Sequence, residues 1–145
     1  MAIVGITPEA VREYVVVSNR KDPVEQQVKW LIGPVDSLSM ARMNDTYMEL
    51  GVDAASGDEI TPTSKNLRIF EWATDICKYG LKGWSNFRDA NGNEIAFATK
   101  KVVAGGLIKE VVDPVVLSRI PLEVLQELSV EIRSVNSLSE TEIKN

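Results

Sequence analysis

The apolar pattern of this chain changes its period at Gly80, and that change limits the folds open to it. From Ser64 to Tyr79 apolar residues recur at helical spacing, and Gly80 is a typical helix stop. Beyond it, Trp84–Arg88 and Asn93–Phe97 can pair as strands around Ala90-Asn91-Gly92, because Asn-Gly tolerates the positive φ of a tight turn. The apolar positions of the helix are Leu67, Phe70, Ala73 or Thr74, and Ile76 with Cys77. A helix followed directly by a hairpin predicts an α+β fold.

The N-terminal segment predicts a short helix and an antiparallel strand pair. Thr7-Pro8-Glu9 has a hydroxyl cap, a first-turn proline and an acid, so a helix ending near Glu13 is expected. Tyr14–Val17 and Gln27–Ile32 are the strands, joined by turn residues from Asn19 to Pro23. One face of the second strand should carry Val28, Trp30 and Ile32.

A second helix is predicted between the strand pair and the Ser64 helix. Ser37 or Ser39 can cap it and Gly51 should stop it. Residues 52–63 lack an apolar period and predict a flexible acidic loop. One side of the helix should form a core stripe, in preference to a partner groove, from Met40, Met43, Tyr47, Met48 and Leu50.

The C-terminal half is expected to be helical. Thr99 caps a short helix weakened by Gly105-Gly106, Asp113-Pro114 begins another, and Ile120-Pro121 begins the last. The last helix has an apolar stripe of Leu122, Leu125, Leu128 and Ile132, and a polar side of Glu123, Glu127, Glu131 and Arg133. We therefore expect small antiparallel hairpins packed against several amphipathic helices, in one domain over residues 1–136 with a polar tail at 137–145.

Length, net charge and cysteine content limit the classes of partner and the cellular location expected for this chain. A chain of 145 residues is long enough for a single core. Its formal charge of -5 argues against a nucleic-acid partner, because such binding rests on Lys and Arg neutralising phosphates. The first residues lack a signal-peptide pattern and no stretch approaches the ~20 apolar residues of a membrane span, so no membrane association and a cytoplasmic location are expected. The single cysteine, Cys77, agrees with a reducing compartment and is expected to be a small buried residue.

The sequence gives little support for a catalytic or metal-binding site. The chain has no histidine, which removes the commonest general base and most hydrolase and zinc arrangements. Gly105 to Lys109 lacks the spacing of a phosphate-binding loop. Asp89 to Glu94 resembles a calcium loop, but its glycine comes fourth and Lys100 stands where the bidentate glutamate belongs, so a turn is favoured. The acids of the predicted loop, Asp53, Asp58 and Glu59, are interpreted as ordinary surface charges. We predict no catalytic, cofactor-binding or metal site.

The aromatic residues of the predicted second hairpin allow two interpretations. Trp84, Phe87 and Phe97 could form an exposed patch for a partner. Aromatic residues on a short hairpin after an amphipathic helix more often cover the apolar face of that helix. Core membership is therefore favoured, and this stretch is interpreted as architecture.

Two stretches resemble a known family. After the predicted helix come Gly80-Leu81, Gly83-Trp84-Ser85-Asn86-Phe87, Asp89-Ala90-Asn91-Gly92 and Ile95-Ala96-Phe97. Near the N-terminus come Ile6-Thr7-Pro8-Glu9, Glu13-Tyr14-Val15, Asp22-Pro23 and Val28-Lys29-Trp30-Leu31. In content and order they resemble the tail assembly chaperones of long-tailed bacteriophages, which often carry a glycine-tryptophan-x-asparagine segment followed by an aspartate and a glycine turn. The likeness covers most of residues 6–136 and departs at residues 34–39, where many relatives have a strand and a leucine-threonine helix start.

The resemblance implies a non-enzymatic assembly factor. Such a chaperone self-associates, coats the helical tape measure protein in the host cytoplasm while tail tube subunits polymerise around it, and is absent from the finished virion. Binding an amphipathic helix calls for an apolar groove, which the C-terminal stripe and the methionine-bearing helix could line. The alternative is a structural virion component, a connector, adaptor or decoration protein, that makes stable symmetric contacts and stays in the particle.

Overall fold

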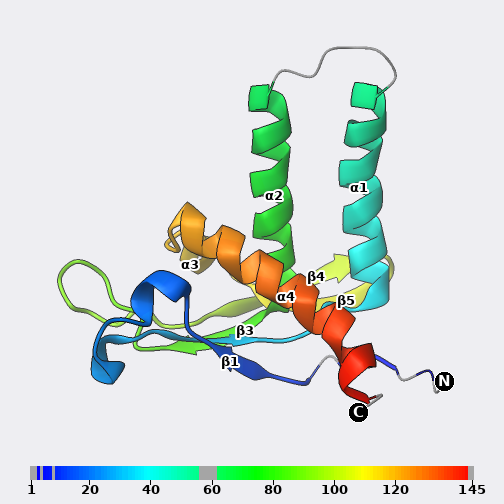
Figure 1. Ribbon diagram of the computed structural model, residues 1–145. Coiled ribbons are helices and arrows are strands. Elements are labelled where there is room, and N and C mark those ends of the chain that lie inside the picture. The colour runs from blue at the N-terminus through cyan, green and yellow to red at the C-terminus, as the bar shows by residue number, and fades with distance from the viewer. Residues whose placement is uncertain (1–2, 4, 8, 56–61, 144–145) are drawn as a thin grey trace.

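The computed structural model describes residues 3, 5–7, 9–55 and 62–143. Two long helices, α1 (Ser37–Ala55) and α2 (Pro62–Gly80), stand side by side in opposite directions above a small sheet (Figure 1). A third long helix, α4 (Leu122–Ile143), crosses the lower part of α2 and covers the same face of the sheet. The α+β fold expected from the sequence is confirmed, with antiparallel strands and a helical C-terminal part.

The main sheet has the antiparallel order β1 (Arg12–Tyr14), β2 (Lys29–Ile32) and β3 (Leu81–Ser85). Tyr14 and Trp84 pair with Trp30 from opposite sides. An antiparallel pair is present as predicted, but its first strand is displaced: of the predicted Tyr14–Val17 only Tyr14 lies in β1. Two 3-10 turns, Val17–Asn19 and Val24–Gln26, lie between the strands. Trp30 and Ile32 are buried on one face with Val28 packed against them, as the alternation predicted.

The helix expected from Thr7 to Glu13 is wrong. The described part of this segment holds a turn, in which the Ala10 N–H donates to Thr7 O at 3.0 Å, and then strand β1; Pro8 lies outside the described residues. Tertiary contacts decide the outcome, because Arg12 forms a 3.0 Å ion pair with Glu131 on α4 while its backbone pairs with β2. A local cap signal is worth about 1 kcal/mol and is easily overridden by such pairing.

Helix α1 begins and ends differently from its prediction. The cap is Asp36, whose Oδ2 accepts the Ser39 N–H at 3.0 Å, and neither Ser37 nor Ser39 serves. Burial opposes ionisation of Asp36, but the Ser39 hydrogen bonds and the Lys109 ammonium, 3.0 Å away, hold its pKa below the usual value. Gly51 does not stop the helix, which runs to Ala55.

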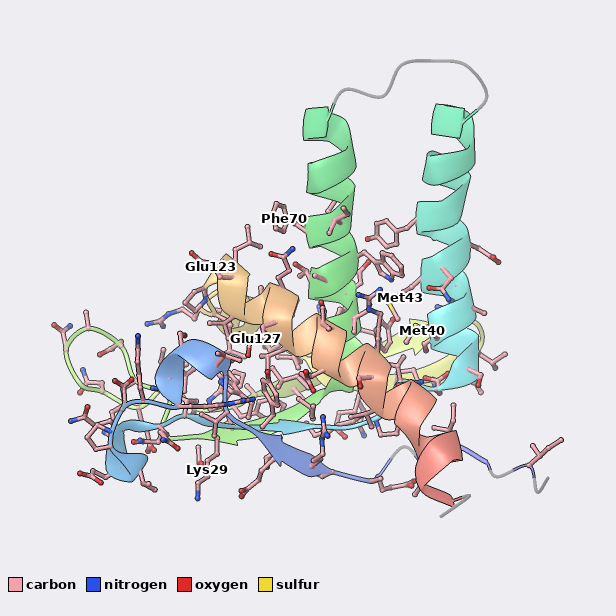
Figure 2. All side chains as sticks on the ribbon, viewed as in Figure 1. Lys29, Met40, Met43, Phe70, Glu123 and Glu127 are labelled. Carbon is pink, nitrogen blue, oxygen red and sulfur yellow. The ribbon has the colours of Figure 1, made fainter. Side chains whose placement is uncertain are left out.

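Where the side chains of α1 are described, its core stripe is confirmed. Met43 is buried, Met40 packs against the core, and both lie on the side of α1 that faces α2 (Figure 2). The side chains of Met48 and Leu50 lie outside the described residues. Of the predicted loop, residues 52–55 and 62–63 are helical, and residues 56–61, with Asp58 and Glu59, fall outside the description.

The helix predicted after Thr99 is also wrong, because a second antiparallel pair occupies this segment. Strand β4 (Thr99–Ala104) and strand β5 (Leu107–Val112) meet at Gly105 and Gly106, with φ of 59° and 77°. Two successive positive φ values are what a two-residue hairpin turn requires. The strand pair predicted within 84–97 is reduced to one bridge, Arg88 to Glu94, because Trp84 belongs to β3.

The C-terminal helices begin where the sequence predicted. Asp113 caps α3 (Pro114–Leu117) by accepting the Val115 N–H at 2.9 Å. Helix α4 starts after Ile120-Pro121, and its backbone stays helical through Ile143, so residues 137–143 continue the last helix. The domain boundary at residue 136 stays a prediction.

The core lies between the inner face of the main sheet and helices α2 and α4. Its buried apolar residues include Trp30, Ile32, Val35, Ile76, Cys77, Leu81, Val112, Leu117, Leu128 and Ile132. Gly80 lets α2 end against α4, because a Cβ at this position would lie 2.5 Å from Ile132 Cγ2. Across the described ranges no helix is long and apolar enough to cross a membrane.

Candidate helix-binding surface

The Cys77 thiol, the most reactive type of side chain in this protein, makes a structural contact within the fold. Burial raises the pKa of the Cys77 thiol to about 12, and its Sγ donates to Leu125 O at 3.2 Å, which ties α2 to α4. The thiol is thus the small buried residue expected from the sequence. Its protonated state makes it a poor nucleophile.

The aspartate-glycine segment is a turn, as predicted. Asp89 Oδ1 accepts the N–H groups of Asn91 and Asn93 at 2.9 and 3.0 Å, and Gly92 has a φ of 81°. The carboxylate is therefore used inside its own turn. No group of three or more potential metal ligands occurs within the described residues.

The aromatic residues after α2 belong to the core, as the sequence favoured. Trp84 makes edge-on contacts with Trp30, Phe87 and Phe97 at centroid distances of 5.7, 5.4 and 4.9 Å. Its Nε1 donates to Ile95 O at 2.6 Å, which fixes the loop that follows β3. Asn86, at φ 66°, donates from Nδ2 to Glu25 O and Gln27 O. The glycine-tryptophan-x-asparagine segment is architecture.

The predicted apolar stripe of α4 packs mainly inside the fold. Leu125, Leu128 and Ile132 are buried against α2, and only Leu122 at the start of the helix is exposed. On the polar side, Glu127 and Glu131 contact β1 while Glu123 and Arg133 remain exposed. The helix therefore uses both predicted faces within the fold.

One side of α2 and one side of α4 meet at the surface. On α2 and on α4 the residues follow the spacing i, i+3, i+4, i+7, so each set lies along one side of its helix. Between them is an open hollow of about 270 Å³, which we call the α2–α4 groove. It is lined by Ile69, Trp72, Ala73, Ile76, Gln126, Ser129, Val130 and Arg133.

The α2–α4 groove has a buried floor and an exposed apolar rim. Ala73 and Ile76 are buried, while Ile69 and Val130 retain 40% and 49% of their exposure on opposite walls. Large apolar side chains left open on both walls of one hollow mark a surface suited to a partner. The sequence signal was present at Ile69 and Trp72, which are not among the apolar positions predicted for this helix between Leu67 and Cys77.

The wall of the groove is held by an aromatic stack. The Trp72 ring stacks on Tyr47 of α1 at 6.0 Å between centroids, and the Arg133 guanidinium lies 4.9 Å from the ring centroid. The Tyr47 hydroxyl donates to Asp75 at 2.7 Å, and burial together with this bond raises the pKa of Tyr47. Side chains from α1 and α4 thus hold the Trp72 indole of α2 in position.

A second hollow opens where α2, α3 and the start of α4 meet. Its volume is about 450 Å³ and its walls are mainly apolar. Leu122 and Pro114 are exposed at its edge. It is lined by Thr74, Pro114, Leu117, Ser118, Ile120, Leu122 and Leu125. Hollows therefore border α4 near its start and near its middle.

Comparison with known proteins supplies no relative. No protein-family model, curated protein or solved structure matches the chain. The proposal below is therefore supported by the groove and by the resemblance in the sequence.

Proposed function

We propose that this protein is a non-enzymatic tail assembly chaperone of a long-tailed bacteriophage. It binds amphipathic helices of the tape measure protein in the host cytoplasm and assists polymerisation of the tail tube around them. It then leaves before the particle is complete. The observation that carries the proposal is the α2–α4 groove, in which an apolar wall from α2 and Val130 on the otherwise polar wall from α4 are offered to a third helix.

The geometry of the groove suits a helix better than an extended peptide. A helix docks through anchors at i, i+3, i+4 and i+7, and both walls of the groove have that same spacing. An extended peptide binds chiefly through main-chain hydrogen bonds to a sheet edge. The groove walls are helices, whose backbone groups are already paired, so side-chain packing must supply the affinity.

A binding experiment tests this assignment. The probe is a set of overlapping peptides covering the predicted helices of the tape measure protein encoded by the same phage, with binding measured by calorimetry. We expect Val130→Glu to weaken binding of the tightest peptide by about tenfold or more, because the new charge would be buried against an apolar anchor. Val24→Glu is the matched control, since Val24 is an exposed valine on the 3-10 turn Val24–Gln26, outside the groove.

The outcomes separate the proposal from its alternatives. Equal binding by wild type and Val130→Glu would remove the groove as the binding site. Failure of every peptide to bind would contradict the chaperone assignment. Quantitative mass spectrometry of infected-cell lysate and purified particles then decides between a departing factor and a virion component, because a fixed copy number in particles would identify a connector, adaptor or decoration protein.

A further inference from the structure

The β4–β5 hairpin has one covered face and one open face. Residues alternate between the faces along each strand, and directly paired residues share a face. On the covered face Ala104 and Val111 are buried and Lys109 forms its ion pair with Asp36. The opposite side is open at Thr99, Lys101, Val103, Ile108 and Glu110, which we name the outer hairpin face, while Val112 at the end of that side is buried in the core.

The outer hairpin face exposes an apolar pair. Val103 and Ile108 are register partners and retain 77% and 74% of their exposure. Among the large apolar side chains of the described residues only Ile3 is more exposed. A half-solvated antiparallel sheet normally places polar residues on its open face. Two adjacent exposed β-branched side chains on this face therefore form an apolar contact surface that a partner would cover.

The charges beside this pair indicate what covers it. Lys101 is the register partner of Glu110, in the row next to Val103 and Ile108. Glu110 is held in place because its Oε1 accepts the Thr99 hydroxyl at 2.6 Å. Two exposed rows of the face therefore each pair a residue on β4 with its complement on β5: Lys101 with Glu110, and Val103 with Ile108.

A face built in this way is complementary to itself. Two copies can stack face to face around a two-fold axis parallel to the strands, which places β4 of one copy over β5 of the other. Lys101 of one copy then lies over Glu110 of the second copy, and Val103 over Ile108 of the second copy. The alternative dimer would pair the β4 edge of one copy with the β4 edge of the other. It would place Lys100 and Lys101 of both copies close together in one short strand pair, which like-charge repulsion disfavours.

We propose that the outer hairpin face is a homodimer contact in which two copies of this chain stack through β4 and β5. The contact has five exposed side chains per copy, well below the ~20–30 residues per side of a stable interface. The dimer is therefore weak and forms as concentration rises. This inference does not depend on the helix-binding proposal, because none of the five residues lines the α2–α4 groove.

Sedimentation velocity of the full chain, at concentrations up to about 1 mM, tests the contact. We expect a monomer–dimer equilibrium for wild type and an equilibrium at least about tenfold weaker for Val103→Lys, because two buried ammonium groups would enter the dimer. Val24→Lys, at an exposed valine of the second 3-10 turn, is the control and should dimerise like wild type.

Charge reversal distinguishes a dimer defect from a folding defect. The Lys101→Glu variant and the Glu110→Lys variant should each dimerise poorly alone, because residue 101 of one copy then lies over a residue 110 of the same charge in the other copy. Mixing these two variants should restore dimerisation, because every stacked pair in the heterodimer is again opposite in sign. A monomeric wild type, full dimerisation of Val103→Lys, or no restoration on mixing would each overturn the proposal. None of these substitutions should change helix-peptide binding, so failure here and failure of the chaperone proposal are separable.

Discussion

Single side chains of the polar face of α4 decide how the N-terminal strand is placed. Glu127 Oε2 accepts the Tyr14 hydroxyl at 2.5 Å and the Val17 N–H at 2.9 Å. Burial first, then the hydrogen bond and the nearby acids, raise the pKa of Tyr14 to about 12. Glu127, predicted to lie on the polar side of the last helix, is therefore an anchor for β1, and the sequence could not identify this role because its partners are more than 100 positions away.

Removing the Tyr14 hydroxyl tests this anchor. We expect Tyr14→Phe to lower the free energy of unfolding by about 1 kcal/mol at neutral pH, measured by urea denaturation, since Glu127 keeps one hydrogen bond.

The raised pKa of Tyr14 means that the folded state favours the neutral phenol. This contribution is fully present below pH 10 and is lost as pH rises from 10 towards 12. The difference between wild type and Tyr14→Phe should shrink over that window, and Tyr79→Phe, at a half-buried tyrosine outside this contact, serves as the control. A constant difference up to pH 12 would contradict the assignment.

At the level of elements, the β4–β5 hairpin is the largest departure from the predicted pattern. Thr99 was interpreted as a helix cap and the two glycines as helix weakeners. The same glycines close a hairpin, and the flanking segments are rich in β-branched residues, which favour strands. Gly105-Gly106 indicates a hairpin turn when the flanking segments pair as strands and a weakened helix when they do not, and the sequence alone does not show which of the two occurs.

The turn itself can be tested at Gly106. We expect Gly106→Ala to destabilise the fold by about 1–2 kcal/mol, because its φ of 77° is strained for a side chain although the space around it is open. Gly106→Asn should cost less, since asparagine tolerates this region of φ. Chemical denaturation of the three proteins measures the order. Equal stability of the alanine variant and wild type would show that the turn relaxes without cost.

At the scale of the whole molecule, one residue late in the chain joins distant parts of the fold. Asn136 of α4 accepts the Val35 N–H with Oδ1 at 3.0 Å and donates from Nδ2 to Val35 O at 2.8 Å. Val35 is buried in the core between β2 and α1. A side-chain amide thus pairs with both backbone groups of a buried residue 101 positions away.

This connection predicts where the chain can be shortened. Asn136→Ala should lower the free energy of unfolding by about 2 kcal/mol, because it leaves two backbone groups of a buried residue unsatisfied. Deleting residues 137–145 should cost less than that, if the domain ends at residue 136 as predicted. Thermal and urea unfolding of both variants measure the costs, with Asn91→Ala in the exposed turn as control. A truncation that costs more than Asn136→Ala would place the boundary further along the chain.

Sequence determined those elements whose signals are local. The stop of α2 at Gly80, the cap and proline at Asp113-Pro114, and the turn at Asn91-Gly92 each depend on backbone preferences within a few residues. The alternation that buries Trp30 and Ile32 is local too, because side chains on a strand alternate between faces wherever it pairs. These features were predicted correctly.

Only the tertiary structure decided which segments pair and which faces meet. Residues 12–14 are a strand because β2 and α4 hold them, and Trp84 joins β3 because Trp30 lies opposite it. The α2–α4 groove exists because α4 crosses α2 at one position, so that Ile69 and Val130 face a common hollow. The physical reason is the same throughout: a local pattern fixes which side of an element is apolar, whereas the free energy of burial is gained only against a surface that the rest of the chain provides.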